Sequence, residues 1–223
     1  MNPLLRRFTA AVAVLGAGAV LGATGALAGT FDGPVPQVVS LVFAGGWSWA
    51  CFGFLVGYTR KSKAESALLA CPALAVGVIV YYGLKALHPA APIGMDAADG
   101  FDTEVNTAGI LVWGTAALLL GAPMGFFGNL ARLPGIAGLP FRLLVPLIVC
   151  IETSSRLAAE ADAAGRGAAL TWSALRVIAV LVAAALVGHV GWTWRARRNR
   201  EQVGAGSDGG TDHPATAQRM PPR

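Results

Sequence analysis

Three ionisable side chains near the end of an apolar run are the residues best placed for chemistry. Glu152 closes the run "LLVPLIVCI", and Arg156 and Glu160 follow at four-residue intervals. A helix would place all three on one face, with Glu before Arg in the favourable order. Arg176 lies about two helical turns inside the next apolar block. Ionisable groups at membrane depth are costly and are treated as functional sites by default.

The sequence predicts an ion pair between Glu152 and Arg176 that joins the fifth and sixth apolar blocks, because each charge needs a partner. This pair has two interpretations. It fixes the packing of two helices, or it is a polar site for a substrate or a proton. Arg156 competes for the same carboxylate.

A second group of charges lies in the stretch "HPAAPIGMDAADGFDTEVN", which contains no Lys or Arg. Its carboxylates belong to Asp96, Asp99, Asp102 and Glu104. Four carboxylates can hold a hard cation such as calcium, but their spacing is not that of an EF-hand loop. We therefore expect a solvated acidic loop and predict no metal site.

The remaining ionisable residues in apolar blocks lie near the block ends. Arg142 and Lys85 can extend to the headgroups, and His189 is placed just below a membrane interface. The sequence contains no P-loop, H-E-x-x-H, G-x-S-x-G or cofactor fingerprint. We expect no enzymatic activity and no cofactor.

The composition places these residues in a membrane protein. The chain is 55% hydrophobic and 13% charged, whereas soluble domains are about 25% charged. Its apolar residues fall in blocks of about 20, the length of a helix that crosses a bilayer. Backbone groups have no partners in lipid, so the spans must be helices. The basic residues flank these blocks as orientation signals do, and we predict no nucleic-acid partner.

The predicted fold class is all-α, a polytopic transmembrane bundle of six spans within residues 1–195. The spans are placed at about 8–28, 35–58, 66–87, 107–130, 136–156 and 170–194. Residues 196–223, rich in Gly, Asp and Pro, are predicted to form a disordered cytoplasmic tail.

Basic residues alternate between the two ends of the predicted spans. They precede the first span, follow the second, fourth and sixth, and are absent after the first and third. Positive loops stay in the cytoplasm, so both termini are predicted to be cytoplasmic. The first span could instead be a signal peptide, because "TGALAG" resembles a cleavage site. Its apolar run exceeds the usual signal core, which favours an uncleaved span.

Small residues are spaced for close helix packing. Gly18 and Gly22, Gly53 and Gly57, and Gly121 and Gly125 are each four residues apart. These faces can pack inside one bundle or against a second copy or another membrane protein. Prolines at 72, 123 and 146 are candidates for kinks or breaks. The cysteines, Cys51, Cys71 and Cys150, fit no metal motif and are expected to pack as small apolar side chains.

The segments "WSWACFGFLVGYTRKSKAESALLACPALAVGVIVYYGL" and "WGTAALLLGAPMGFFGNLAR", with Glu152 closing the fifth span, are similar to an uncharacterised family of small six-span membrane proteins. Members of that family come from bacteria with Ala- and Gly-rich proteomes. The resemblance covers about two-thirds of the chain and implies six spans in a bacterial cytoplasmic membrane. It implies no activity.

The sequence therefore leaves two main functional hypotheses. The first is a structural or accessory membrane protein that acts through helix packing. The second is a small transporter or channel with a polar site near Glu152 and Arg176. A cavity that reaches Glu152 would favour the second.

Overall fold

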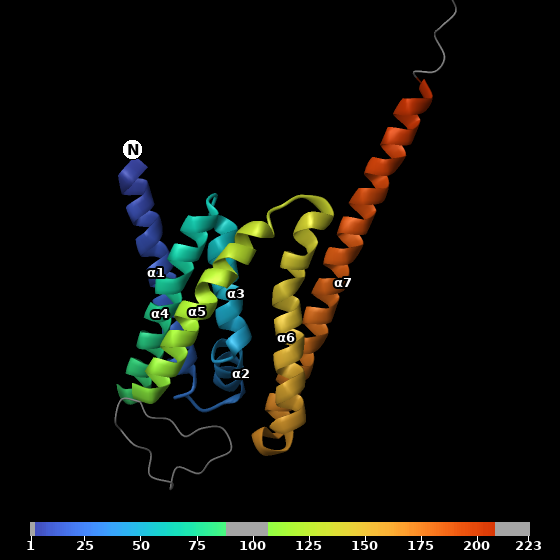
Figure 1. The fold of residues 1–223 in the computed structure, drawn as a ribbon. Helices are drawn as coiled ribbons and strands as arrows, with labels where there is room; N and C mark the ends of the chain where they lie inside the picture. Colours follow the sequence, from blue (N-terminus) through green and yellow to red (C-terminus); the bar gives the residue numbers. More distant parts are fainter. Residues whose placement is uncertain (1–2, 88–106, 208–223) are drawn as a thin grey trace, which may run out of the picture.

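The computed structural model describes residues 3–87 and 107–207, and these residues form helices joined by short turns (Figure 1). The elements are α1 (Pro3–Ala28), α2 (Pro34–Phe43), α3 (Gly46–Thr59), α4 (Lys63–Leu87), α5 (Thr107–Leu130), the short 3-10 helix η1 (Gly135–Gly138), α6 (Leu139–Ala159) and α7 (Ala161–Ser207). No strand occurs in this part of the chain, as the predicted all-α class requires. The predicted acidic loop at 96–104 lies outside the described residues.

Five stretches are long and apolar enough to cross a membrane: Phe8–Ala28, Lys63–Leu87, Thr107–Leu130, Gly135–Ala159 and Asp162–Ala196. A sixth candidate is the bent pair formed by α2 and α3. The predicted spans overlap these stretches, but the second and the last differ from the prediction. The second span was predicted as one continuous helix, but the chain bends by 59° between α2 and α3.

The last helix also differs from the sequence prediction. Gly165 has φ 79° and ψ 173°, so the chain leaves helical geometry there before α7 continues to Ser207. The predicted tail began at residue 196, but "RARRNREQ" is rich in helix formers and contains no Gly or Pro, which explains why the helix continues through residue 202. The guanidinium of Arg198 lies 4.7 Å from the Trp194 ring centroid. Residues 208–223 of the predicted tail lie outside the described part.

Helices α1, α4, α5 and α3 form the main bundle, and glycines allow their backbones to touch. A Cβ atom on Gly18 or Gly22 of α1 would collide with backbone carbonyls of α4. The same holds for Gly57 of α3, which meets the backbone of Gly125 on α5. These small-residue faces are therefore used inside the chain, where lipid offers no hydrophobic driving force and close packing must stabilise the bundle.

Polar side chains satisfy several helix ends. At the end of α3, the Arg60 carbonyl accepts hydrogen bonds from Asn129 Nδ2 and Arg132 Nη1, both at 2.6 Å. Beyond α5, Arg142 donates to the carbonyls of Ala131 at 2.7 Å and Leu133 at 2.9 Å. Unpaired backbone groups cost several kcal/mol in lipid. Arg142 therefore has a structural role at the junction of α5 and α6, beyond its predicted extension to the headgroups.

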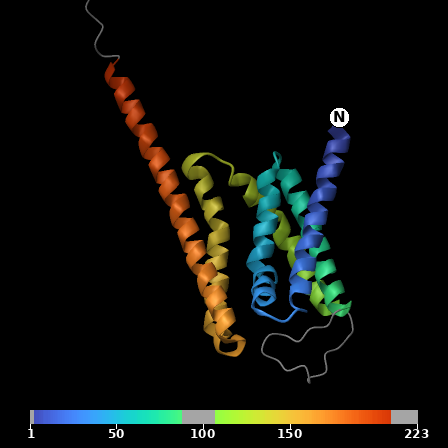
Figure 2. The same cartoon turned by 180° about the vertical axis from the view of Figure 1, so that it is seen from behind.

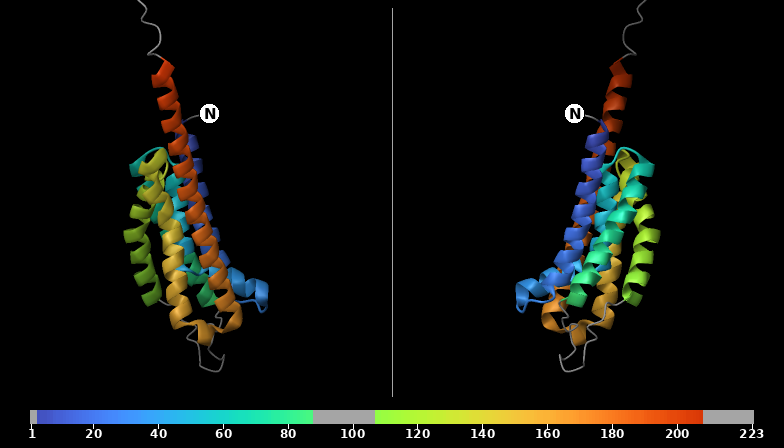
Figure 3. Two further views of the ribbon diagram at one scale, coloured as in Figure 1. Left: turned by 90° about the vertical axis from the view of Figure 1, so that its right-hand side faces the viewer. Right: turned by 90° about the vertical axis from the view of Figure 1, so that its left-hand side faces the viewer.

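Helices α6 and α7 form a hairpin beside this bundle. Figure 2 shows from behind that α7 leans away from the other helices toward its C-terminal end. The beginning of α1 and the end of α7 lie at one end of the molecule, with the α3–α4 and α5–α6 connections. We call this end A. The opposite end, end B, contains the α1–α2 and α6–α7 turns, and Figure 3 shows α2 projecting sideways there.

Candidate functional site: a cavity beside a broken helix

The break between α2 and α3 is built by two adjacent glycines. Gly45 is the N-cap of α3 in an extended conformation, with φ −69° and ψ 140°. The carbonyl of Phe43, at the end of α2, accepts hydrogen bonds from Trp49 Nε1 at 3.1 Å and Ser48 Oγ at 3.2 Å. Side chains of α3 thus hold the end of α2 in place. The first amides of α3 still need partners, because a helix cannot satisfy its own first N–H groups.

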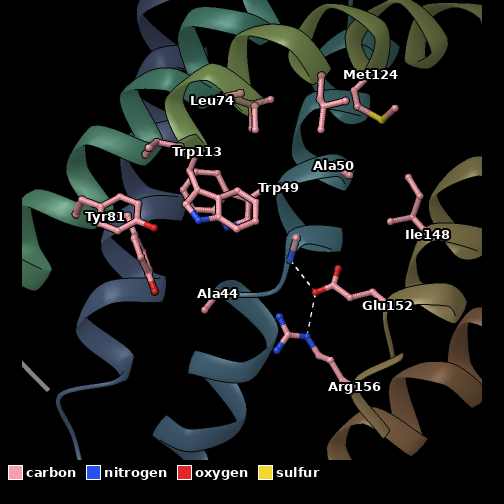
Figure 4. A pocket seen from close by; sticks show the side chains of 16 residues that line it. Ala44, Trp49, Ala50, Leu74, Tyr81, Trp113, Met124, Ile148, Glu152 and Arg156 are labelled. Atoms are coloured by element: carbon pink, nitrogen blue, oxygen red, sulfur yellow. Dashed lines mark hydrogen bonds and ion pairs between the residues drawn. The ribbon is translucent and has the colours of Figure 1, made fainter. Parts of the chain in front are cut away.

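Glu152 of α6 supplies those partners. Gly46 N donates to Glu152 Oε1 at 2.9 Å, and Trp47 N donates to Glu152 Oε2 at 2.7 Å. Figure 4 shows the carboxylate of Glu152 between the start of α3 and the guanidinium of Arg156. A carboxylate at a helix N-terminus gains from both the free amides and the helix dipole. Glu152 therefore ties α6 to the broken span.

Arg156 completes the charge arrangement on the same helix. Its Nε donates to Glu152 Oε1 at 3.1 Å, and its Nη1 donates to Glu160 Oε2 at 3.2 Å. Its guanidinium also lies 6.0 Å from the Trp172 ring centroid of α7. The one-face arrangement predicted for Glu152, Arg156 and Glu160 is therefore present as two ion pairs.

The structure does not bring Glu152 and Arg176 together. Arg176 has an exposed side chain on α7, and it makes no ion pair with Glu152 among residues 3–87 and 107–207. The physical reason is that Arg176 lies on an exposed side of α7, while the carboxylate of Glu152 binds the α3 amides and Arg156. An exposed arginine near the outer part of a span can instead extend toward the headgroups.

A cavity of about 600 Å³ begins at Glu152 and runs between α3, α4, α5 and α6. This volume is within the range of small-molecule binding sites. The charged side chains at its end are Glu152 and Arg156, and its walls are mostly apolar and aromatic. The wall residues are Ala44, Gly46, Trp49, Ala50, Leu74, Val78, Tyr81, Tyr82, Trp113, Ala116, Ala117, Leu120, Met124 and Ile148 (Figure 4).

Aromatic rings give one side of the cavity a defined shape. Trp49 meets Tyr81 edge to face, with ring centroids 6.1 Å apart, and Tyr81 meets Tyr82 at 5.2 Å. Lys85 Nζ lies 5.5 Å from the Tyr81 ring centroid, a cation–π contact on this wall. Tyr81 and Tyr82 thus both line the cavity.

The cavity lies where the hairpin and the bundle make few contacts. Its walls come from α5 on one side and α6 on the other, with α3 behind them. No described helix stands in front of α3 between α5 and α6 (Figure 1).

Sequence reasoning identified Glu152 and Arg156 but missed the α3 amides and the rings of Trp49 and Trp113. The signal for the break was the Gly45–Gly46 pair inside an apolar block, since adjacent glycines mark turns. No local signal places Trp113 of α5 on the wall of the same cavity as Glu152, because that arrangement depends on the packing of distant segments.

The chain matches no protein-family model, no curated protein and no solved structure. The resemblance to a six-span family therefore stays a prediction from the sequence, and the function must be argued from the site.

Proposed function

We propose that the protein is a non-enzymatic, multi-pass membrane protein that binds a small amphipathic molecule in the cavity beside Glu152, as a small transporter or carrier would. The observation that carries this proposal is the cavity, which joins a charged end at Glu152 and Arg156 to an apolar, aromatic body. Transporters commonly place binding sites at broken helices, whose N-termini face anionic groups of the substrate; in this chain the carboxylate of Glu152 occupies that position at α3.

The lining indicates the kind of molecule. A hydrophilic solute would leave polar groups unpaired along Trp113, Leu120 and Met124, at a cost of about 1–3 kcal/mol each. An amphiphile avoids this cost, with its apolar part along those residues and its polar group at Glu152 and Arg156. Tryptophan and tyrosine suit such ligands because their rings are apolar and their edges polar.

We further propose six crossings, both termini in the cytoplasm, and a location in the cytoplasmic membrane of a bacterium. Counting α2 and α3 as one broken span supports six. Arg60, Lys61 and Arg132 lie in the connections at end A, where the positive-inside rule would place the cytoplasm. End B, with the Glu152 end of the cavity, would then face outward.

This orientation predicts which introduced cysteines an impermeant thiol reagent will label in intact cells. In a background without Cys51, Cys71 and Cys150, Phe31→Cys in the α1–α2 turn should react before lysis. Lys61→Cys in the α3–α4 turn should react only after lysis. The opposite pattern would invert the topology, and labelling of both positions in intact cells would contradict it.

The binding proposal predicts a bound amphiphile after purification. Native mass spectrometry of gently delipidated protein should show one retained amphipathic molecule per chain. Ala116→Phe places a ring in the cavity and should reduce the bound fraction at least about tenfold, corresponding to about 1.4 kcal/mol.

Ala108→Phe is the matched control, because Ala108 is an exposed residue of the same helix that does not line the cavity. It should retain the amphiphile. A purely structural or accessory protein would instead carry no specific occupant, or would lose it equally in both variants.

A further inference from the structure

We infer that the protein binds an anionic phospholipid at end A, on a basic surface formed by the α3–α4 connection and the end of α5 (Figure 1). We call this surface the basic patch and define it by Arg60, Lys61, Lys63 and Arg132. None of these residues lines the cavity, so the lipid site and the proposed cavity ligand are separate. Three features of the patch point to a lipid: its excess charge, its fixed geometry and its position next to exposed apolar side chains.

The patch has more positive charge than its neighbours balance. Arg60 pairs with Glu65 at 3.7 Å between Nη1 and Oε1, which offsets one of the four charges. The other three members are exposed and form no ion pair within residues 3–87 and 107–207. Arg142 adds a further positive charge at the neighbouring junction of α5 and α6. Basic clusters of this kind, next to membrane spans, attract anionic headgroups.

Hydrogen bonds hold the two parts of the patch together. The Arg60 carbonyl accepts from Asn129 Nδ2 and Arg132 Nη1, which ties the α3–α4 connection to the end of α5. Lys63 Nζ lies 5.9 Å from the ring centroid of Phe126, a second contact between the same parts of the chain. The fold therefore brings the cations together before a headgroup binds, and such preorganisation lowers the cost of binding.

The patch lies where headgroups meet acyl chains. Lys63 is the first residue of one candidate span, and Arg132 follows shortly after the end of another. Just inside the spans, Leu55 and Tyr58 of α3 and Phe126 of α5 are exposed. A phospholipid satisfies both kinds of surface, because its phosphate contacts the cations while its acyl chains lie along apolar side chains. Free phosphate in water satisfies only the cations.

The test compares how tightly full-length protein binds phosphatidylglycerol and phosphatidylcholine with identical acyl chains. Both lipids contain a phosphate diester, but only phosphatidylglycerol has a net negative charge. The patch is exposed, so delipidation empties it, and native mass spectrometry then counts the lipids that bind during a titration in detergent. We expect one phosphatidylglycerol per chain to bind at least about tenfold more tightly than phosphatidylcholine.

Lys61→Gln/Lys63→Gln should weaken phosphatidylglycerol binding by about tenfold or more, because each basic residue near an anionic surface contributes about fivefold. Lys61→Arg/Lys63→Arg keeps both charges and should keep the affinity. The two lysines are exposed and make no hydrogen bond within the described residues, so the fold should persist, as circular dichroism can verify. If the double variant does not fold, Lys61→Gln alone decides, with an expected loss of about fivefold.

Arg195→Gln/Arg198→Gln is the matched control. Both arginines are exposed on the part of α7 that lies toward end A, and their loss changes the net charge equally. Arg198 contacts Trp194 of its own helix, and no hydrogen bond in the described part of the chain ties either arginine to the patch. This variant should keep the affinity for phosphatidylglycerol.

Equal binding of the two lipids would overturn the lipid site, as would an equal loss in the lysine and arginine variants. Competition by inorganic phosphate, beyond that of chloride at the same ionic strength, would assign the patch to free phosphate and would also overturn it. Ala116→Phe should remove the retained cavity ligand and leave phosphatidylglycerol binding unchanged, so either proposal can fail without the other.

Discussion

Gly125→Ala is expected to lower the free energy of unfolding by about 2–3 kcal/mol, although it adds only one methyl group. A Cβ at Gly125 would collide with the Ser66 carbonyl oxygen and lie 2.9 Å from the Ala70 Cβ of α4. Backbone atoms cannot move aside as a flexible side chain can. The helices must separate, and overpacking of this kind costs about 1–3 kcal/mol. Thermal unfolding in detergent, followed by circular dichroism, measures the loss.

Gly114→Ala on the same helix is the matched control. No atom lies within 4 Å of a Cβ built at Gly114, so this methyl group meets open space. Alanine is the better helix former by about 1 kcal/mol, and the control should be neutral or slightly stabilising. Equal losses in both variants would show that the Gly125 contact with α4 does not govern stability.

These glycines illustrate what the sequence could predict. The four-residue spacing of Gly121 and Gly125 indicated a close helix interface, because small residues are what helices need to approach in lipid. The spacing did not identify the neighbour. In the structure Gly125 packs against α4 and against Gly57 of α3, within the same chain. This choice of neighbour depends on the packing of segments that are far apart in sequence.

The broken span shows a different limit. Three prolines inside apolar blocks were the candidates for kinks, yet α4, α5 and α6 continue through Pro72, Pro123 and Pro146. The break occurs at Gly45 and Gly46. A proline removes one hydrogen bond that neighbouring groups can replace in a membrane bundle. A break between two helices, however, needs a partner for several amides, and only Glu152, more than a hundred residues away, supplies it.

The sequence correctly grouped Glu152, Arg156 and Glu160 on one helix face. The predicted ion pair between Glu152 and Arg176 is not formed. The helical spacing placed Arg156 beside Glu152, which the structure contains. The predicted pair requires Arg176 to point inward from α7, yet its side chain is exposed. Sequence spacing determines neighbours on one helix, whereas the rotation of a second helix about its axis depends on all of its contacts.

Glu152→Ala is expected to lower the free energy of unfolding by about 1–2 kcal/mol, mainly through the start of α3. It leaves the exposed amide of Gly46 and the partly buried amide of Trp47 without their acceptor, and only a buried donor without a partner costs the full penalty of about 1–3 kcal/mol. Water reaching the half-buried site limits the total. Glu160→Ala removes an exposed ion pair and should cost less than about 0.5 kcal/mol.

A double-mutant cycle can separate the partners of Glu152. Arg156→Ala should couple to Glu152→Ala by about 1 kcal/mol, because the two side chains share a hydrogen bond. Arg176→Ala should be additive with Glu152→Ala within about 0.5 kcal/mol, as expected for residues that do not meet. Arg156→Ala alone should cost less than Glu152→Ala, since the α3 amides keep their acceptor. Strong coupling to Arg176 would mean that α7 turns this residue inward, and the carboxylate would then hold α6 to α7 and not to the broken span.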